Sequence, residues 1–523
     1  MPLRSTERTP AAPPAIPRFL LPALVLAVLG YQINATMLSP ALPDIARRLD
    51  TSSSLVGLSQ TLFFLMAAVG QVTMARLSDY RGRKPVMLLC GALLILGNLA
   101  CALAPGISVY LAGRVLQGVS AAMFSLAFLT LNDLLPPAAF GRAAGIISAV
   151  NGGFAGVDAI LGGRLADTVG FRAIFVGGLL LSVVGTAAVA RCVPAVAPKA
   201  EGAMDWLGAT LLALGLSGVL IGLAQGAGWG WTSVATLGCV LGGLAALTAF
   251  VLVQRARSGT ARTAADGDGA RTDAERADGE WTDGAQAGGE GRPGSPGPRT
   301  TPVIDIRLLA SRRAWPLLLT VTLTLAGAFG ALALTVPLFT QDPHAGYGLS
   351  ATRAALLYAT PAAAIGVVGA PLAGYFGPRV GWRRVALVGS AGSLLAFAVA
   401  VLFRDEPWVL FAALAVLGLT YNGISITALN GLAVVSAPKD QQGALTGLTG
   451  ACFGVGASLG TALASGLITA AGTGGATGAA AYTGAFEAAL VLLVLAMATA
   501  LVIRSVPADE STHEARRTPA AHL

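Results

Sequence analysis

The feature that most constrains the fold of this chain is a series of apolar runs, each about 20 residues long, that recurs along most of the sequence. A helix of that length crosses about 30 Å of hydrocarbon. The runs lack the helical or strand periods with a polar face that soluble elements show. Of the 523 residues, 54% are hydrophobic and only 11% are charged, and a soluble core could not tolerate that composition. We therefore expect an all-α polytopic membrane protein.

The apolar runs fall into groups of six, two and six, each run bounded by charged or turn residues. This grouping predicts 14 spans, arranged as two six-helix bundles with two additional helices between them. The predicted spans are 18–40, 53–75, 86–104, 107–131, 142–163, 171–191, 206–225, 233–253, 314–339, 351–374, 384–403, 407–433, 442–470 and 482–504.

The segments outside these groups are polar. Residues 255–301 are rich in Gly, Ala, Asp, Glu, Arg, Thr and Pro, and hold too little apolar surface to offset the entropy of ordering. We expect a disordered linker there, and disordered tails at 1–17 and 505–523. The expected domains are a first bundle at 18–191, the additional helices at 206–253 and a second bundle at 314–504.

The formal net charge is +8, but the cations stand at the ends of apolar runs instead of forming one basic face with interleaved aromatics. That distribution argues against nucleic-acid binding. The short loops predicted to share one side carry Arg76, Arg81, Arg83, Lys84, Arg142, Arg191, Lys199, Arg379, Arg383, Arg384 and Lys439. The opposite loops are poorer in cations, although they contain Arg47, Arg48, Arg164, Arg172 and Arg404. By the positive-inside rule, both termini and the linker face the cytoplasm. Sparse lysine beside abundant Arg, Ala and Gly is typical of a GC-rich bacterial genome, so we expect a bacterial plasma membrane.

Catalytic and metal-binding patterns are not found in the sequence. The five cysteines have no CxxC spacing, and two of the three histidines, His513 and His522, lie in the polar tail. Neither a paired nucleophile and base nor a nucleotide-binding loop is present. We expect no enzyme, no metal and no cofactor, and we expect an ion gradient, of protons, to supply the energy.

The two halves of the sequence contain a repeat. ARLSDYRGRKPV at 75–86 joins two spans of the first half, and GYFGPRVGWRRV at 374–385 does the same in the second. A glycine-rich span follows each loop, 70 residues after Gly82 in one half and 69 after Gly381 in the other. Chance matches between glycine-rich spans are the alternative. Duplicated helical halves around a central site are a recurring plan of transporters, and they suit rigid-body rocking about the bilayer midplane.

The first of these loops resembles a signature of the major facilitator superfamily, and the chain as a whole is similar to its 14-span drug:proton antiporters. Ala75 to Lys84 match the family's loop between its second and third spans, with Ala75 in place of the opening glycine. The resemblance implies the major-facilitator fold and a conformational latch, while anchoring of topology alone is the other interpretation. The predicted latch residues are Asp79, Gly82, Arg83 and Lys84. Pro378 replaces Asp79 in the second copy, so we expect a weaker or absent second latch.

The segment Leu111 to Gly118 resembles the family's fourth-span motif. Its Arg114 falls inside an otherwise apolar span, where a charge costs a few kcal/mol and should be paired or face water. The resemblance implies a role for Arg114 in proton coupling, and a structural buried cation is the alternative. Asn34 stands where many 14-span antiporters carry an acid, and asparagine does not titrate.

The fifth span offers a replacement acid. The family's motif there ends in Gly-Pro, two residues and Gly-Gly, and this chain has Asp158 at the glycine of Gly-Pro. Counting about 1.5 Å per residue places Asp158, Asn34 and Arg114 at comparable depth. We hypothesise that Asp158 is the titratable partner of Arg114 and that Asn34 binds or orients it. Asp158 could instead cap the span or pair with Arg164. Close helix packing is expected at Gly152, Gly153, Gly156, Gly162 and Gly163.

A substrate cavity is predicted from Gln117, Tyr421 and Asn422, of which the last two could instead bond between helices. The predicted function is secondary active transport, with proton-coupled efflux of small amphipathic compounds such as drugs, antibiotics or secondary metabolites. A metabolite symporter or facilitator of the same fold is the alternative. The expected partners are a small-molecule substrate and the lipid bilayer, and we expect a monomer.

Overall fold

The structure, a computed structural model, describes residues 17–38, 41–51, 53–198, 203–278, 300–301, 311, 314–349, 351–437, 442–473 and 480–504. Helices make up most of this part of the chain. Twelve of the helices found among the described residues are long and apolar enough to cross a membrane, and a shorter apolar helix occupies Leu20–Ala35. The prediction of an all-α polytopic membrane protein is confirmed.

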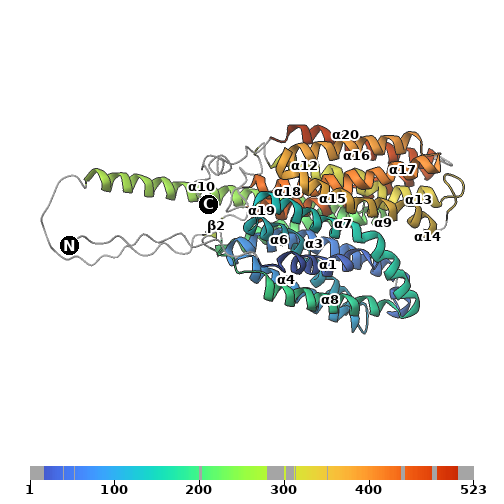
Figure 1. The fold of residues 1–523 in the computed structure, drawn as a ribbon, viewed down its shortest axis with the longest axis horizontal. Coiled ribbons are helices and arrows are strands. Elements are labelled where there is room, and N and C mark those ends of the chain that lie inside the picture. Colours follow the sequence, from blue (N-terminus) through green and yellow to red (C-terminus); the bar gives the residue numbers. More distant parts are fainter. Residues whose placement is uncertain are drawn as a thin grey trace, which may run out of the picture.

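The first half forms one helical bundle, coloured blue to teal in Figure 1. Its turns follow local chemistry: Gly82 (φ 86°) precedes α4 and Gly170 (φ 103°) precedes α8, in a backbone region that glycine adopts without strain. A proline opens α7, at a position where its missing N–H costs nothing. The helices are α1 (Leu20–Thr36), α2 (Leu42–Arg48), α3 (Ser53–Arg81), α4 (Arg83–Ala102), α5 (Ile107–Val119), α6 (Ala122–Leu134), α7 (Pro137–Thr168) and α8 (Phe171–Cys192).

The additional elements are β1 (Ala203–Met204), α9 (Trp206–Trp229), α10 (Val234–Asp278) and β2 (Thr300–Thr301). Asp205 caps α9 by accepting a hydrogen bond from the Gly208 N–H at 2.8 Å. The same carboxylate accepts one from Gln254 of α10 at 2.9 Å. β1 pairs with β2 in parallel. The start of α9 is thereby tied both to α10 and to the returning chain.

The second half forms the other bundle, yellow to red in Figure 1. Several of its helices contain π-helical turns, which are frequent at functional sites of helical proteins. The elements are α12 (Trp315–Thr324), η2 (Leu325–Phe329), η3 (Ala331–Thr335), α13 (Val336–Gln341), α14 (Ala351–Ala354), η4 (Ala355–Ala359), α15 (Thr360–Val380), α16 (Trp382–Leu402), α17 (Pro407–Leu417), η5 (Gly418–Ser425), α18 (Ile426–Ser436), α19 (Gln442–Thr473) and α20 (Ala480–Val502).

The two bundles meet along two helix pairs, α3 with α19 and α7 with α15, and α9 packs against both α3 and α19. Glycine permits the close approach. A Cβ built on Gly447 would lie 2.8 Å from the Cα of Val72, and one on Gly145 would lie 2.8 Å from the Cα of Pro371. Such small-residue contacts are the usual means by which membrane helices pack closely.

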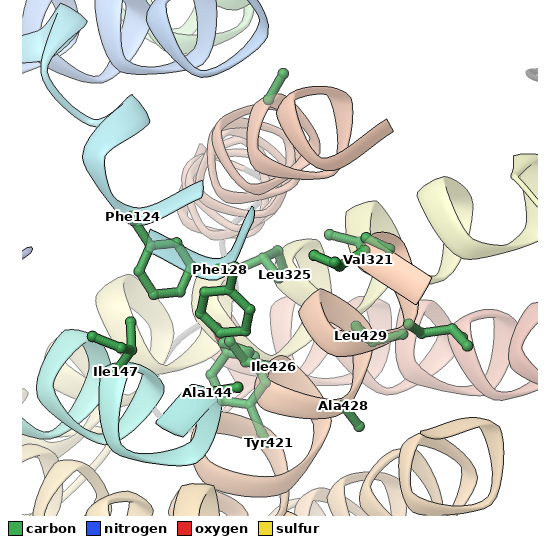
Figure 2. Close-up of a cluster of buried hydrophobic side chains, with 14 of the residues drawn as sticks. Phe124, Phe128, Ala144, Ile147, Val321, Leu325, Tyr421, Ile426, Ala428 and Leu429 are labelled. Carbon is green, nitrogen blue, oxygen red and sulfur yellow. The ribbon is translucent and has the colours of Figure 1, made fainter. Parts of the chain in front are cut away.

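Apolar side chains from both bundles share one buried cluster (Figure 2). Phe124 and Phe128 of α6 lie beside Tyr421 of η5 and Ile426 of α18. The Phe124 and Phe128 rings are 5.0 Å apart. The core is therefore continuous across the interface between the two halves, where α3 meets α19 and α7 meets α15, and which we call the seam.

Three predicted boundaries differ from the structure. The first predicted span, 18–40, is shorter, because α1 ends at Thr36 and Pro43 opens the separate helix α2. The predicted span 107–131 extends to Leu134, and its helix is interrupted near Ser120, whose N–H donates to the Gln117 carbonyl in a tighter turn.

The third difference concerns the linker. Helix α10 continues to Asp278, so the start of 255–301 is helical and not disordered as predicted. Frequent alanine and arginine, both good helix formers, favour this extension. Residues 279–299 and the predicted tails at 1–16 and 505–523 lie outside the described residues.

Candidate functional site

Arg114 is the most deeply buried cation of the first bundle, with 0% of its surface exposed. Its Nη1 donates to the Asn34 carbonyl at 3.0 Å and to Gln117 Oε1 at 2.7 Å. Its Nη2 donates to Gln60 Oε1. Oxygens from α1, α3 and α5 thus surround the guanidinium, and every acceptor recorded among the described residues is neutral.

Aromatic rings complete this surrounding. The Arg114 guanidinium carbon lies 4.1 Å from the centroid of the Phe63 ring, a cation–π geometry that favours a desolvated cation. Tyr31 stacks on Phe63, with ring centroids 5.8 Å apart and planes 9° from parallel. These contacts offset part of the cost of holding a charge in the membrane.

A chain of hydrogen bonds leads away from Arg114. Gln117 Nε2 donates to Asn98 Oδ1 at 3.1 Å, and Asn98 Nδ2 donates to Ser182 Oγ at 3.1 Å. The site therefore extends to α4 and α8. Gln60, Asn98 and Ser182 were not predicted as site residues, although a polar side chain within an apolar run is the signal that could have found them.

Asn34 and Arg114 meet, as the depth count predicts, but through the backbone of Asn34. The Asn34 side chain donates to the Gly30 carbonyl at 2.7 Å. The Asp158 side chain lies outside the described residues, so its pairing with Arg114 stays a prediction. Its helix is in place: α7 packs against α1, and a Cβ built on Gly162 would lie 2.7 Å from Cγ of Met37.

Two of the five predicted packing glycines can be placed. Gly162 meets Met37 of α1, and Gly152 meets Asn422 of the second half, 2.6 Å from a built Cβ to Oδ1. Both sites have room for hydrogen only. The surroundings of Gly153, Gly156 and Gly163 lie outside the described part of the structure.

The loop between α3 and α4 holds a buried ion cluster. Asp79, 0% exposed, accepts from Arg83 at 2.6 Å on Oδ1 and from Arg76 at 3.1 Å on Oδ2. Arg83 also donates to Ser78 Oγ at 2.6 Å and to Asp133 Oδ2 at 3.1 Å. The cluster joins α3, α4 and α6, and Arg76, Ser78 and Asp133 are members that the latch prediction omitted.

The other predicted latch residues have different surroundings. Gly82 has a positive φ, and a Cβ built on it would lie 2.9 Å from the Val196 carbonyl oxygen. Both conditions require glycine. Lys84 is partly exposed in the first turn of α4.

Asp79 also touches the opposite bundle. A Cβ built on Gly443 of α19 would lie 2.6 Å from Asp79 Oδ2. The carboxylate therefore lies against the first turn of α19, where the positive end of the helix dipole favours a negative charge.

Two of the three residues predicted to line a cavity, Tyr421 and Asn422, lie at the seam between the halves. Tyr421 is 4% exposed and packs in the cluster of Figure 2. Asn422 Nδ2 donates to the Gly152 carbonyl of α7 at 3.2 Å. Asn422 thus makes the interhelical bond of the alternative, Tyr421 packs among apolar side chains, and Gln117 bonds to Arg114 and Asn98.

An apolar groove of about 400 Å³ lies between α9 and α19, lined by Leu223, Trp231, Leu459, Ala462, Leu463, Gly466 and Leu467.

Within the described residues, no group of three or more His, Cys, Asp or Glu side chains is arranged to hold a metal ion.

Two acids outside the membrane spans stabilise loops. Burial raises the pKa of Asp44, but hydrogen bonds from Arg48, Arg47 and the Phe171 N–H outweigh it and hold the pKa below its usual value. Asp44 thereby ties α2 to the first turn of α8, at 3.1 Å from Oδ2 to the Phe171 nitrogen.

Asp342 organises the loop after α13. The His344 N–H donates to its Oδ1 at 2.8 Å, the Ala345 N–H at 3.0 Å, and the Tyr482 hydroxyl to Oδ2 at 2.9 Å. The hydrogen bond from the His344 N–H is the largest cause of the lowered pKa of Asp342, and together with the bonds from Ala345 and Tyr482 it outweighs the opposing effect of burial.

Comparison with known proteins shows the family of the chain. The family model described as Major Facilitator Superfamily matches residues 24–206, 202–461 and 344–522. The chain is 29% identical over 452 residues to the uridine/deoxyuridine transporter of Lactococcus lactis subsp. cremoris, covering 84% of this chain and 85% of that protein. It is 24% identical over 431 residues to the multidrug resistance protein Stp of Mycobacterium tuberculosis, covering 82% and 71%.

Solved structures show the same fold. The human organic anion transporter MFSD10 (TETRAN) superposes with a TM-score of 0.61 at 16% identity, covering 94% of this chain and 100% of that one. The proton:xylose symporter XylE superposes with a TM-score of 0.58 at 12% identity, covering 93% and 95%. The chain is therefore a multi-pass membrane transporter and not an enzyme, and it belongs to the Major Facilitator Superfamily.

Proposed function

We propose that this chain is a proton-coupled exporter of small amphipathic compounds that works by alternating access. The observation that carries the proposal is Arg114, a fully buried cation whose recorded acceptors are all neutral oxygens. A guanidinium held this way is available to a carboxylate that gains and loses a proton.

Asp158 is the acid best placed to be that carboxylate. α1 and α7 are the first and fifth helices of the bundle in the proposed topology, so they cross the membrane in the same direction. Gly162 contacts Met37, and counting about one turn back along each helix would put the backbones of Asp158 and Asn34 at a similar level. Arg114 donates to the Asn34 carbonyl at that level.

Proton coupling would follow because Arg114 exchanges its hydrogen-bond partners. With Asp158 ionised, the carboxylate competes with Gln117 and Gln60 for the guanidinium, and with Asp158 protonated, the amides hold Arg114 as observed. Because a buried carboxyl changes protonation with access to water while its arginine partner keeps its charge, one side of the membrane would load the proton and the other would release it.

The seam between the halves supplies the moving part. The contacts of Asp79 with Gly443, and of α7 with α15, close the side that holds the 79–84 loop. Rocking of the bundles would break these contacts and open the same side. We assign this side to the cytoplasm, with both termini, on the distribution of cations.

The proposal includes 14 spans and a monomer in the bacterial plasma membrane. To the twelve spans identified by length and composition it adds α1 and α7. α7 is 32 residues long, and α1 continues toward α2 at the outer surface. The similarity to the protein Stp supports a drug substrate.

A nucleoside symporter is the second candidate, favoured by the similarity to the uridine/deoxyuridine transporter over 84% of this chain. In this candidate Arg114 and Asp158 keep their roles while the direction of coupled substrate movement is reversed.

Flux measurements separate the candidates. Inverted vesicles with an acid interior should accumulate a fluorescent amphipathic cation and lose luminal protons as they do so. Right-side-out vesicles with acid outside should accumulate labelled uridine only if the chain is a nucleoside symporter. Vesicles without the protein give the baseline, and substrate movement indifferent to the pH gradient in both preparations would contradict proton coupling.

A further inference from the structure

The loop of the second half places a tryptophan where the first half has its central arginine. When Gly82 is aligned with Gly381, Trp382 corresponds to Arg83, Pro378 to Asp79 and Gly377 to Ser78. Both aligned glycines have positive φ, 86° and 94°, so the two loops share their backbone turn. Each half therefore presents a different side chain on the same scaffold.

The Trp382 ring packs against two glycines of its own half. A Cβ on Gly377 of α15 would lie 2.6 Å from the Trp382 ring, and so would one on Gly431 of α18. The ring thus bridges α15 and α18, much as Arg83 bridges α3 to α6 through Asp133. Only 7% of Trp382 is exposed.

The same ring reaches the other half. Phe140 of α7 packs on Trp382, with centroids 5.9 Å apart and planes at 63°. Phe140 in turn contacts Phe128 of α6 at 6.4 Å. An aromatic row therefore runs from the first bundle into the second.

Pro378 supports this contact. A Cβ built on Gly141 of α7 would lie 2.5 Å from Cγ of Pro378, and it would also meet the Gly374 carbonyl oxygen. Pro378 thus touches α7 from the position that corresponds to Asp79, whose carboxylate touches α19. Both Asp79 and Pro378 therefore contact the opposite bundle, Asp79 through a charged carboxylate and Pro378 through an apolar ring.

We propose that Trp382 is the centre of a second, uncharged latch that closes the cytoplasmic side through Phe140. The expected weak or absent second latch is replaced by an aromatic one. The inference rests on the rocking motion of the proposed function, because the Trp382–Phe140 pair lies across the seam and separates when the bundles part. In this proposal Trp382 stabilises the closed conformation and does not contact the substrate.

Distances between spin labels test this latch without substrate or proton gradient. Labels at Ala190 and Leu501, both exposed at the ends of α8 and α20, report separation of the bundles. The accessible cysteines Cys192, Cys239 and Cys452 are first replaced. Trp382→Ala should raise the ratio of long to short distances by about two- to tenfold, the range expected for one lost aromatic pair with its packing. Trp382→Phe should restore part of the closed population.

Matched variants keep the result decisive. Phe140→Leu removes the partner on the other bundle, leaves Trp382 seated, and should give the same shift, with no further shift in the double variant. Trp408→Ala, at a tryptophan 79% exposed, should leave the distances unchanged. Distances in Trp382→Ala and Phe140→Leu that match the Trp408→Ala control would overturn the proposal. A failed transport assay would not, because the distance measurement needs no flux.

Discussion

Asp79 and Gly443 meet across the two bundles: a Cβ built on Gly443 would lie 2.6 Å from Asp79 Oδ2 and 2.8 Å from its carboxylate carbon. The acid also binds Arg76 and Arg83 within its own bundle. One carboxylate thus joins the ion cluster of the first loop to the first turn of α19.

Gly443→Val should prevent this closed contact. The added side chain must displace the Asp79 carboxylate and the Ala75 carbonyl, and overpacking of this kind costs about 1–3 kcal/mol. We expect transport in vesicles to fall about tenfold at normal membrane levels. Gly484→Val is the control, because nothing lies within 4 Å of a Cβ built there. Equal transport in the two variants would show that the contact is dispensable.

Arg83→Ala should destabilise the fold as well as the latch. It leaves two buried carboxylates, Asp79 and Asp133, each short of a partner, and breaking a buried pair from one side costs about 3–5 kcal/mol. The thermal unfolding midpoint in detergent should drop clearly. Arg81→Ala, at an exposed neighbour, should change stability by no more than about 0.5 kcal/mol. Similar midpoints for both variants would refute the ion cluster as a stabilising feature.

Arg114→Lys should lose transport although it keeps the charge. A lysine ammonium cannot reproduce the two-sided donation to Gln117 and Gln60, and loss of a charge-assisted hydrogen bond costs about 1.5–3 kcal/mol. We expect at least about tenfold slower pH-driven flux. Arg172→Lys, at an exposed arginine outside this site, is the control. Wild-type flux in Arg114→Lys would remove the planar guanidinium from the mechanism.

Asp342 should make stability depend on pH at the acid end. Its pKa is lowered in the folded chain, so its stabilising contribution is fully present above the unfolded value of about 3.9 and is lost as pH falls through the folded value. The midpoint difference between wild type and Asp342→Asn should therefore be constant near neutral pH and shrink below about pH 4. A difference that grows on acidification would have the wrong sign for this assignment.

Hydropathy alone was sufficient for most of the fold, because span length is set by bilayer thickness and not by tertiary contacts. It did not locate the break at Ser120 or the π-helical turns, which depend on packing against neighbouring helices. Hydropathy also placed the end of the eighth span at 253, whereas α10 continues to Asp278 because the residues that follow have sufficient helix propensity.

The candidate site was predicted in part. Motif resemblance identified Arg114 and Asp79, and depth counting brought Asn34 to Arg114, since helical rise is regular. The contact uses the Asn34 carbonyl, which no side-chain motif encodes. Gln60, Asn98 and Asp133 have side chains with partners 19 to 84 positions away, and only the fold brings these pairs together.

The most direct test of proton coupling compares Asp158→Asn with wild type in two assays on the same vesicles. Substrate exchange without a pH gradient should persist, because rocking and substrate binding do not require the proton. Accumulation driven by an imposed pH gradient should be lost in Asp158→Asn, retained in part in Asp158→Glu, and unchanged in Glu487→Gln, which alters an exposed acid of α20. Full pH-driven accumulation by Asp158→Asn would contradict the account.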